Sequence, residues 1–202
     1  MNLLLENVEE SMPVILHPPP MTDDEYYDLC RRYEAFRVER MQDGSIVIMS
    51  PTGWETGFRN NKLAMRLGHW AEQDGRGQAF DSNTEYLLPD GSALSPDASW
   101  VSQNRIDQVS PSERKKFPKL CPEFIVELMS PSDRLADAKD KMQLWIKNGA
   151  ELGWLIDPER RQVFIYRPGC GPQTLDNPAQ VTGVGPVAGF VLDLKDIWAG
   201  LS

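Results

Sequence analysis

The sequence predicts one α/β or α+β domain. Stretches with helical and strand periodicity alternate along the chain, no segment repeats, and 202 residues are enough for a single domain with its own hydrophobic core. We expect residues 1–20, which end in three consecutive prolines, to form a flexible arm, and residues 21–202 to form the domain.

The N-terminal part of the domain predicts a helix, a hairpin and a longer helix. Thr22 and Glu25 form a capping-box pair, so a helix is expected to begin there and to reach about residue 33. Apolar residues alternate on both sides of the Asp-Gly pair at 43–44, which favours the tight turn of a β-hairpin. Apolar residues then recur at helical spacing over 55–73.

The C-terminal part predicts further strands and one more helix. Short strands are expected within residues 78–101, and residues 124–128 form a nearly continuous apolar run that is typical of a buried strand. A helix from about 134 to 148 separates that strand from two others, at 152–156 and 163–166.

The charge and the start of the chain exclude several classes of protein. The net charge of −9 argues against non-specific nucleic-acid binding through a basic face, although a local basic cleft on an acidic body stays open. No apolar run approaches the ~18 residues of a membrane span, and the first ten residues carry no basic segment of a secretory signal. We therefore expect no association with membranes.

Cysteine and histidine usage points to a reducing compartment. Cys30, Cys121 and Cys170 are odd in number and far apart, which fits free thiols in a cytoplasmic protein better than a disulfide framework. With two histidines and no Cys-x-x-Cys pair, the sequence leaves almost no room for a Cys/His zinc site, and it excludes enzymes of the HNH or HExxH type.

Two acidic residues lie where a charge is costly. Glu127 interrupts the apolar run 124–128, and an unpaired buried carboxylate costs several kcal/mol, so this side chain should face a cleft beside a cation or a metal. Asp97 follows a proline and begins a short strand. Position alone leaves an alternative open for each residue. Glu127 could be an edge glutamate paired with a surface basic residue, and Asp97 could form an ordinary Asx turn.

Lys141 falls inside the apolar arc of the expected helix at 134–148, where it needs an anionic partner or must reach the rim. Two carboxylates on adjacent strands can hold Mg²⁺, and a lysine beside them can orient water and stabilise phosphate charge. A bare pair of carboxylates would equally suit glycoside hydrolysis, but that interpretation leaves the inward lysine unexplained.

Three stretches share a combined motif: Ser-Pro-Asp-Ala-Ser-Trp-Val at 95–101, residues 121–133 around Glu127, and residues 149–158. Together with Lys141 they resemble the Uma-type family of "putative restriction endonucleases", which belongs to the PD-(D/E)XK nuclease superfamily. The resemblance runs from about residue 21 to residue 198. It implies a restriction-endonuclease-like fold, with a mixed central sheet flanked by helices and an N-terminal helix and hairpin.

The resemblance also implies roles for individual residues. Asp97 matches the metal-binding acid of the Pro-Asp motif and Glu127 the acid of the (D/E)XK motif, while the backbone carbonyl of Leu128 would complete the metal shell. The position of the motif lysine is held by Met129, and Lys141 matches members in which the lysine moves to the following helix. The implied cofactor is Mg²⁺ or Mn²⁺.

Glu39, in the hairpin, matches an acid of the family's N-terminal motif and is expected to approach the same cleft; its alternative is a surface ion pair with Arg37 or Arg40. Two groups of basic residues could contact phosphates or could simply be solvated. They are Arg59, Lys62 and Arg66 at helical spacing, and Lys115 and Lys116 with their neighbours Arg114 and Lys119.

The resemblance thus implies a metal-dependent nuclease that hydrolyses phosphodiester bonds in DNA, as a restriction-type endonuclease. The alternative is a catalytically silent module of the same fold that binds nucleic acid or a protein partner. We expect a homodimer, because cutting both strands of a duplex takes two active sites.

Overall fold

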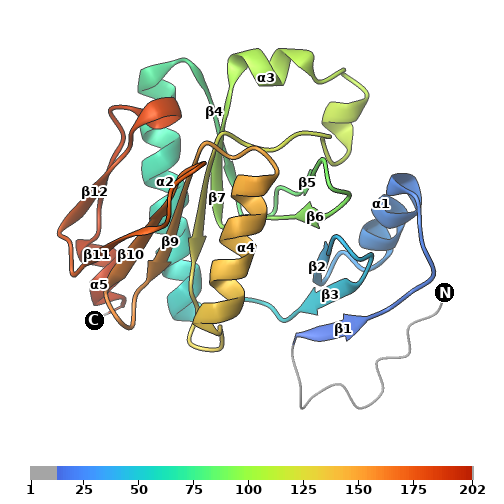
Figure 1. Cartoon of the computed structure of the whole chain (residues 1–202), viewed down its shortest axis with the longest axis horizontal. Helices are drawn as coiled ribbons and strands as arrows, with labels where there is room; N and C mark the ends of the chain where they lie inside the picture. Colours follow the sequence, from blue (N-terminus) through green and yellow to red (C-terminus); the bar gives the residue numbers. More distant parts are fainter. Residues whose placement is uncertain (1–12, 202) are drawn as a thin grey trace.

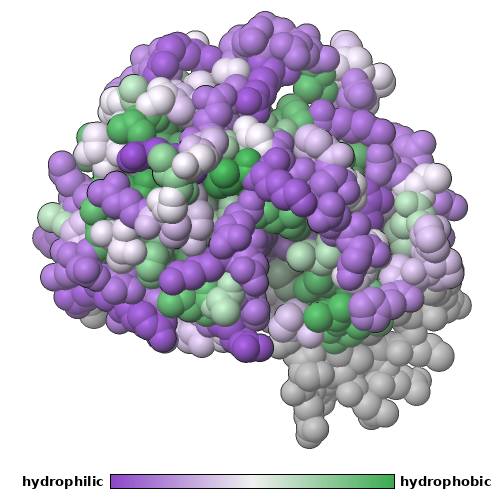
Figure 2. Space-filling model, in the orientation of Figure 1, coloured by the Kyte–Doolittle hydropathy of each residue, from purple (hydrophilic) through white to green (hydrophobic). Residues whose placement is uncertain are grey.

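The computed structural model describes residues 13–201. Its larger part is a six-stranded sheet flanked by helices, and a smaller sheet with helix α1 lies beside it, formed mainly by the N-terminal segment (Figure 1). Hydrophilic side chains cover most of the face seen in Figure 2, with apolar patches between them. The expected α+β class is confirmed.

The larger sheet is mixed, as expected. Its strand order is β11-β10-β9-β8-β7-β4, and every neighbouring pair is antiparallel except β8 and β9. Helix α4 connects these two parallel strands, which is the crossover that a parallel pair requires. The strands are β4 (Gly77–Asp81), β7 (Ala98–Ser102), β8 (Phe124–Leu128), β9 (Leu152–Asp157), β10 (Gln162–Tyr166) and β11 (Gln173–Asp176).

Two helices pack on opposite faces of this sheet. Helix α2 (Trp54–Asp74) packs on the face that carries Phe124 and Val126 of β8, whereas α4 (Leu135–Lys147) packs on the face that carries Ile125. The side chains of β8 therefore alternate between two hydrophobic cores, as the sequence pattern predicts. Glu127 shares a face with Ile125 and so points towards α4.

The smaller sheet has the order β1-β3-β2-β6-β5, and all of its pairs are antiparallel. Its hairpin of β2 and β3 turns at the predicted Asp-Gly, and Thr22 and Glu25 form the predicted capping box at the start of α1. The elements are β1 (Val14–Leu16), α1 (Asp23–Arg32), β2 (Arg37–Arg40), β3 (Ile46–Met49), β5 (Tyr86–Leu87) and β6 (Ala93–Leu94).

The predicted flexible arm needs a correction. Residues 1–12 lie outside the described residues, but Val14–Leu16 pair with Ile46–Ile48 of β3 as an edge strand. The apolar side chains at the ends of this segment pack on the core of the smaller sheet. The smaller sheet therefore includes residues before residue 21.

The remaining elements are short and lie at the edges of the larger part. Strands β12 and β13 pair in a separate two-stranded sheet, and α5 packs against α2. They are α3 (Gln103–Gln108), η1 (Glu113–Lys115), β12 (Gln180–Thr182), η2 (Gly185–Val187), β13 (Val191–Asp193) and α5 (Lys195–Ala199). Within the described residues, no helix is long and apolar enough to cross a membrane.

Candidate active site

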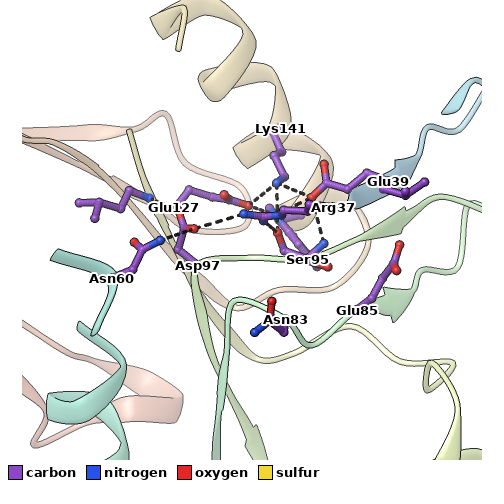
Figure 3. Close-up of polar contacts among 12 residues, drawn as sticks. Arg37, Glu39, Asn60, Asn83, Glu85, Ser95, Asp97, Glu127 and Lys141 are labelled. Carbon is purple, nitrogen blue, oxygen red and sulfur yellow. Dashed lines mark hydrogen bonds and ion pairs between the residues drawn. The ribbon is translucent and has the colours of Figure 1, made fainter. Parts of the chain in front are cut away.

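The predicted acids and lysine come together where the two sheets meet. Asp97 directly precedes β7, Glu127 lies near the end of β8, Lys141 lies in the middle of α4, and Glu39 lies in β2. All four side chains point towards one another in Figure 3. The four residues are separated by up to 102 positions in the sequence, so only the tertiary fold assembles them.

The Asp97 carboxylate ties β7 to β8 and to α2. Its Oδ2 accepts a hydrogen bond of 2.7 Å from the backbone N–H of Leu128. Its Oδ1 accepts from Nδ2 of Asn60 in α2 at 3.2 Å and lies 3.4 Å from Nη1 of Arg37 in β2. These donors fix the orientation of the carboxylate beside the end of β8.

The Lys141 ammonium group joins three acceptors from three parts of the chain. Its Nζ lies 2.9 Å from Oε1 of Glu39 and 3.0 Å from Oε1 of Glu127. It also donates to the backbone carbonyl of Ser95 at 3.2 Å. The prediction that this side chain lies on the buried face of its helix is confirmed, and the anionic partner that burial requires is a pair of glutamates.

Glu127 keeps one carboxylate oxygen available. Its Oε1 accepts from Nε1 of Trp145, one turn after Lys141 in α4, at 2.8 Å. Its Oε2 has no hydrogen-bond donor among residues 13–201. The α4 helix therefore holds one oxygen of Glu127 in place, and the other accepts no hydrogen bond from the described residues.

Burial and charge act against each other on these groups. Burial, together with the nearby charges of Asp97 and Glu39, raises the pKa of Glu127 to about 7, although Lys141 opposes the shift. Burial would also raise the pKa of Glu39, but Lys141 and Arg37 together outweigh it and lower that pKa. Burial disfavours the charged form of Lys141, yet the two glutamates raise its pKa, so it stays protonated.

The cluster of acids and cations carries a net negative charge. Three carboxylates and two cationic side chains, Arg37 and Lys141, give the site a formal charge of −1 when all are ionised. No group of three or more His, Cys, Asp or Glu side chains within residues 13–201 has the geometry of a metal cage. Mg²⁺ does not need one, because it binds through one or two carboxylates and keeps several waters. Metal binding by Asp97 and Glu127 therefore stays a prediction.

The structure adds Asn60, which the sequence analysis missed, and places Arg37, named there only as a surface partner of Glu39, among the acids of the site. Arg37 contacts Asp97, Glu39 and the Ser95 carbonyl, and its Nε is buried without a hydrogen-bond partner in the described part of the chain. The Oδ1 atom of Asn60 is also buried and has no hydrogen-bond partner among the described residues. The signal for Asn60 is its helical spacing to the buried Leu63 of α2, which places an amide on the edge of an apolar stripe.

The first group of predicted phosphate contacts faces α5. Arg59 donates to the Ile197 carbonyl and pairs with Glu55 at 3.0 Å, while Arg66 pairs with Asp196 at 2.6 Å. Lys62 lies 3.8 Å from the same aspartate and 5.3 Å above the ring of Phe58. The two arginines thus bridge α2 to the C-terminal segment, and a role in phosphate binding stays a prediction.

The second group lies beside α1. Lys116 pairs with Asp24 at 2.7 Å, and Lys119 pairs with Asp23 at 2.8 Å. The backbone carbonyl of Lys115 accepts a hydrogen bond from Tyr27 at 3.2 Å. These contacts attach the loop before β8 to the N-terminal helix, and the predicted phosphate contacts of this group are likewise untested.

The cysteine prediction is confirmed for the described residues, because Cys30, Cys121 and Cys170 are all free thiols. Burial raises the pKa values of Cys30 and Cys121 to about 12, so neither is a nucleophile at neutral pH.

Comparisons with known proteins agree with the fold. The model of the Uma2 family, described as "Putative restriction endonuclease", matches residues 23–195. A crystal structure described as "a putative nuclease belonging to DUF820", from Anabaena variabilis, superposes with a TM-score of 0.72 at 24% identity. The match covers 89% of this chain and 98% of that one. No functionally curated protein matches the sequence.

Proposed function

Because the chain belongs to the Uma2 family of "putative restriction endonucleases", we propose that it is a metal-dependent nuclease that hydrolyses phosphodiester bonds in DNA. The observation that supports this most is the meeting of Asp97, Glu127 and Lys141 in one buried cluster with a surplus negative charge. Phosphodiester hydrolysis needs a cation to offset phosphate charge, and this cluster offers oxygen ligands for it.

The ligands of Mg²⁺ or Mn²⁺ would be Asp97, Glu127 and the backbone carbonyl of Leu128. When bound, the ion would polarise the phosphate and lower the pKa of a bound water. The Leu128 N–H that holds Oδ2 of Asp97 at 2.7 Å keeps the carboxylate directed at the end of β8. Asn60, in α2, donates to Oδ1 of Asp97. It would orient this ligand without binding the metal itself.

Lys141 would act as a fixed positive charge rather than as a base, because its two glutamate partners keep it protonated. In this role it orients the attacking water and stabilises the charge that develops on the phosphate. Met129, at the usual position of the motif lysine, is buried in the apolar cluster beside α4 and takes no part. Arg37, whose side chain is partly exposed, is the second cation available to a phosphate oxygen.

We further propose that the protein acts as a homodimer, because cleavage of both strands of a duplex takes two such sites. Its three free thiols support a location in the cytoplasm, where thiols stay reduced.

Cleavage of plasmid DNA by the purified protein in Mg²⁺, Mn²⁺ or EDTA tests the proposal. We expect nicking or linearisation that needs the metal and that is lost in Asp97→Asn and Glu127→Gln. Both variants nearly preserve side-chain shape, and their melting temperatures serve as the folding control. A folded protein that binds DNA but does not cut it with either metal would instead favour the catalytically silent module.

A further inference from the structure

The outer side of helix α2 carries no charged residue over most of its length. The helix lies behind the larger sheet, opposite α4 (Figure 1). At ~100° per residue, Asn61 points almost opposite to the buried Leu63. The residues within about 60° of Asn61, from the start of the helix to its fourth turn, are Trp54, Gly57, Phe58, Asn61, Ala64, Met65 and Gly68. We call this set the α2 outer face.

The composition of the α2 outer face is unusual for a surface in contact with water. The solvent side of a helix ordinarily carries charged and polar side chains, and 25% of the residues of this chain are charged. Here the large side chains are apolar and exposed, because Trp54 exposes 86% of its surface and Met65 exposes 57%. An exposed apolar face of this kind is typical of an interaction surface.

The glycines of the α2 outer face have no role in the packing of the chain itself. Glycine destabilises the interior of a helix relative to alanine. A Cβ atom added at Gly57 or at Gly68 would meet no atom within 4 Å, so no neighbour in the described part of the chain requires either glycine. Close approach of another molecule to the helix backbone would explain both residues.

The order of large and small residues makes the α2 outer face complementary to itself. Each large side chain has a small residue at the same distance on the other side of Asn61. The pairs are Trp54 with Gly68, Gly57 with Met65, and Phe58 with Ala64. If a two-fold axis at Asn61 relates two α2 helices, the helices run antiparallel and the members of each pair lie level with each other. A large side chain of one copy then meets a small residue of the other, and the two Asn61 amides can form hydrogen bonds with each other.

We propose that two copies of this chain associate through the α2 outer face, with their α2 helices antiparallel. The inference rests on the proposed homodimer and names its interface. Each copy has a net charge of −9, so two copies repel each other, and a face without charged residues lets them approach at the lowest electrostatic cost. Interface cores are depleted of charge and enriched in aromatic residues and Met, as this face is.

Nucleic acid fits the α2 outer face less well than a second copy does. Binding to DNA phosphates depends on cations, and the face contains neither Lys nor Arg. The cations beside it are committed within the chain, because Lys62 and Arg66 both lie near Asp196, at 3.8 and 2.6 Å.

Sedimentation velocity over a range of protein concentrations, without DNA or metal, measures the dimer. One helix from each copy makes a small interface, so we expect a dissociation constant in roughly the micromolar range. Met65→Glu should weaken the dimer about 10-fold or more, because it places an acid of each copy against the apolar face of the other. Ile15→Glu is the matched control and should have little effect, since Ile15 is exposed to the same 57% but lies in β1 of the smaller sheet.

A steric variant separates a contact between copies from a role within the chain. Gly57→Leu should weaken the dimer, because its side chain would meet the partner's Met65. The melting temperature of the monomer should not fall, since a Cβ at Gly57 meets no atom of its own chain and glycine is the poorer helix former. Adding Met65→Ala to Gly57→Leu should restore the dimer, because the large and small residues then exchange places about Asn61.

Equal dissociation constants of wild type and Met65→Glu would overturn this interface and leave the homodimer standing. Equal weakening by Met65→Glu and Ile15→Glu would also overturn it, because the added charge and not its place would then decide. A wild type that stays monomeric at every concentration would overturn both the interface and the homodimer. These measurements involve neither DNA nor metal, so a failure of the interface stays distinct from a failure of the nuclease function, which plasmid cleavage tests.

Discussion

Two buried glutamates in this protein have different partners. Glu127 and Glu85 expose only 8% and 6% of their surfaces. Glu127 has Lys141 at 3.0 Å and lies in a cluster with three carboxylates and two cations. Glu85 forms no ion pair within the described residues, and its close partner is the hydroxyl of Tyr26 at 2.5 Å. The two buried glutamates therefore differ in charge compensation: cations pair with Glu127 and its neighbours, whereas none pairs with Glu85 in the described part of the chain.

The cation near Glu85 is committed elsewhere. Arg40 lies over the ring of Tyr26 but donates to Asp23 at 2.6 Å and to the Gly91 carbonyl at 3.0 Å. Burial raises the pKa of Glu85 to about 8, so it is mostly protonated at pH 7. The Tyr26 hydroxyl donates to Oε1 of Glu85 and lies 3.1 Å from the Val38 carbonyl, which is its second acceptor. Burial thus favours the protonated form of Glu85.

The largest expected effect is on the rate of DNA cleavage, which should depend on Glu127 but hardly on Glu85. Glu127→Gln and Asp97→Asn should lower the cleavage rate about 1,000-fold or more, since each removes a metal ligand worth several kcal/mol in the transition state. Glu85→Gln should leave the rate within a few-fold of wild type. Rates of plasmid cleavage in Mg²⁺ measure all three. Equal losses in Glu85→Gln and Glu127→Gln would contradict the distinction.

The second effect tests whether Lys141 compensates the buried acids. Lys141→Met should lower the free energy of unfolding by about 3 kcal/mol at pH 8, because it removes the closest cation of two buried carboxylates. Lys139→Met is the matched control, since Lys139 lies two residues away in the same helix and contacts the ring of Phe164 at 4.5 Å. Urea unfolding of both variants is the measurement. Similar losses in both would mean that the ion pairs with Lys141 add nothing.

The third effect concerns pH. The folded pKa of Glu85, about 8, exceeds its ordinary value of 4.5, so its protonated form stabilises the fold. That stability is complete below pH 4.5, falls by up to about 1.4 kcal/mol per pH unit between pH 4.5 and 8, and is absent above pH 8. Glu85→Gln should flatten this part of the stability profile.

Glu127→Gln should remove a separate decline that ends near pH 7, because burial raises the pKa of that group to about 7. Chemical unfolding across this pH range, with both variants beside wild type, resolves the two contributions. A wild-type slope that survives in Glu85→Gln without change would show that Glu85 is charged in the folded protein.

The smallest effect concerns the cations of α2. Arg66→Ala should cost about 0.5 kcal/mol of stability, as partly exposed ion pairs do, because Arg66 joins α2 to Asp196. Its effect on DNA affinity decides between a structural bridge and the predicted phosphate contact. We expect less than a twofold change in duplex affinity at moderate salt. A clear drop in duplex affinity, together with a smaller dependence of that affinity on salt, would mean that Arg66 contacts a DNA phosphate.

Local patterns were enough to predict most of the fold. The apolar run of β8, the capping box of α1 and the Asp-Gly turn each depend on neighbours in the sequence, and each lies where expected. The edge strand β1 was missed because its pairing with β3 depends on partners 30 to 34 residues away. A three-residue strand carries too little periodicity to be recognised alone.

The same limit applies to the candidate site. Asp97, Glu127 and Lys141 each break a local pattern, so the sequence points to them. Arg37 breaks none, because an arginine in a hairpin is an ordinary residue, and Asn60 gives only the weak signal of an amide on the edge of an apolar stripe. Their importance comes from contacts with Asp97 across 60 and 37 positions, which only the packing of β2 and α2 on the sheet creates.

Calorimetric titration with Mn²⁺ tests the central claim most directly. The claim is that the cluster of Asp97, Glu127, Glu39, Arg37 and Lys141 binds the metal ion, and that a buried acid without such neighbours does not. At pH 8 we expect saturable binding to wild type and to Glu85→Gln, and loss of that binding in Asp97→Asn and Glu127→Gln. Binding that persists in both of the latter variants, or that disappears in Glu85→Gln, would contradict the account.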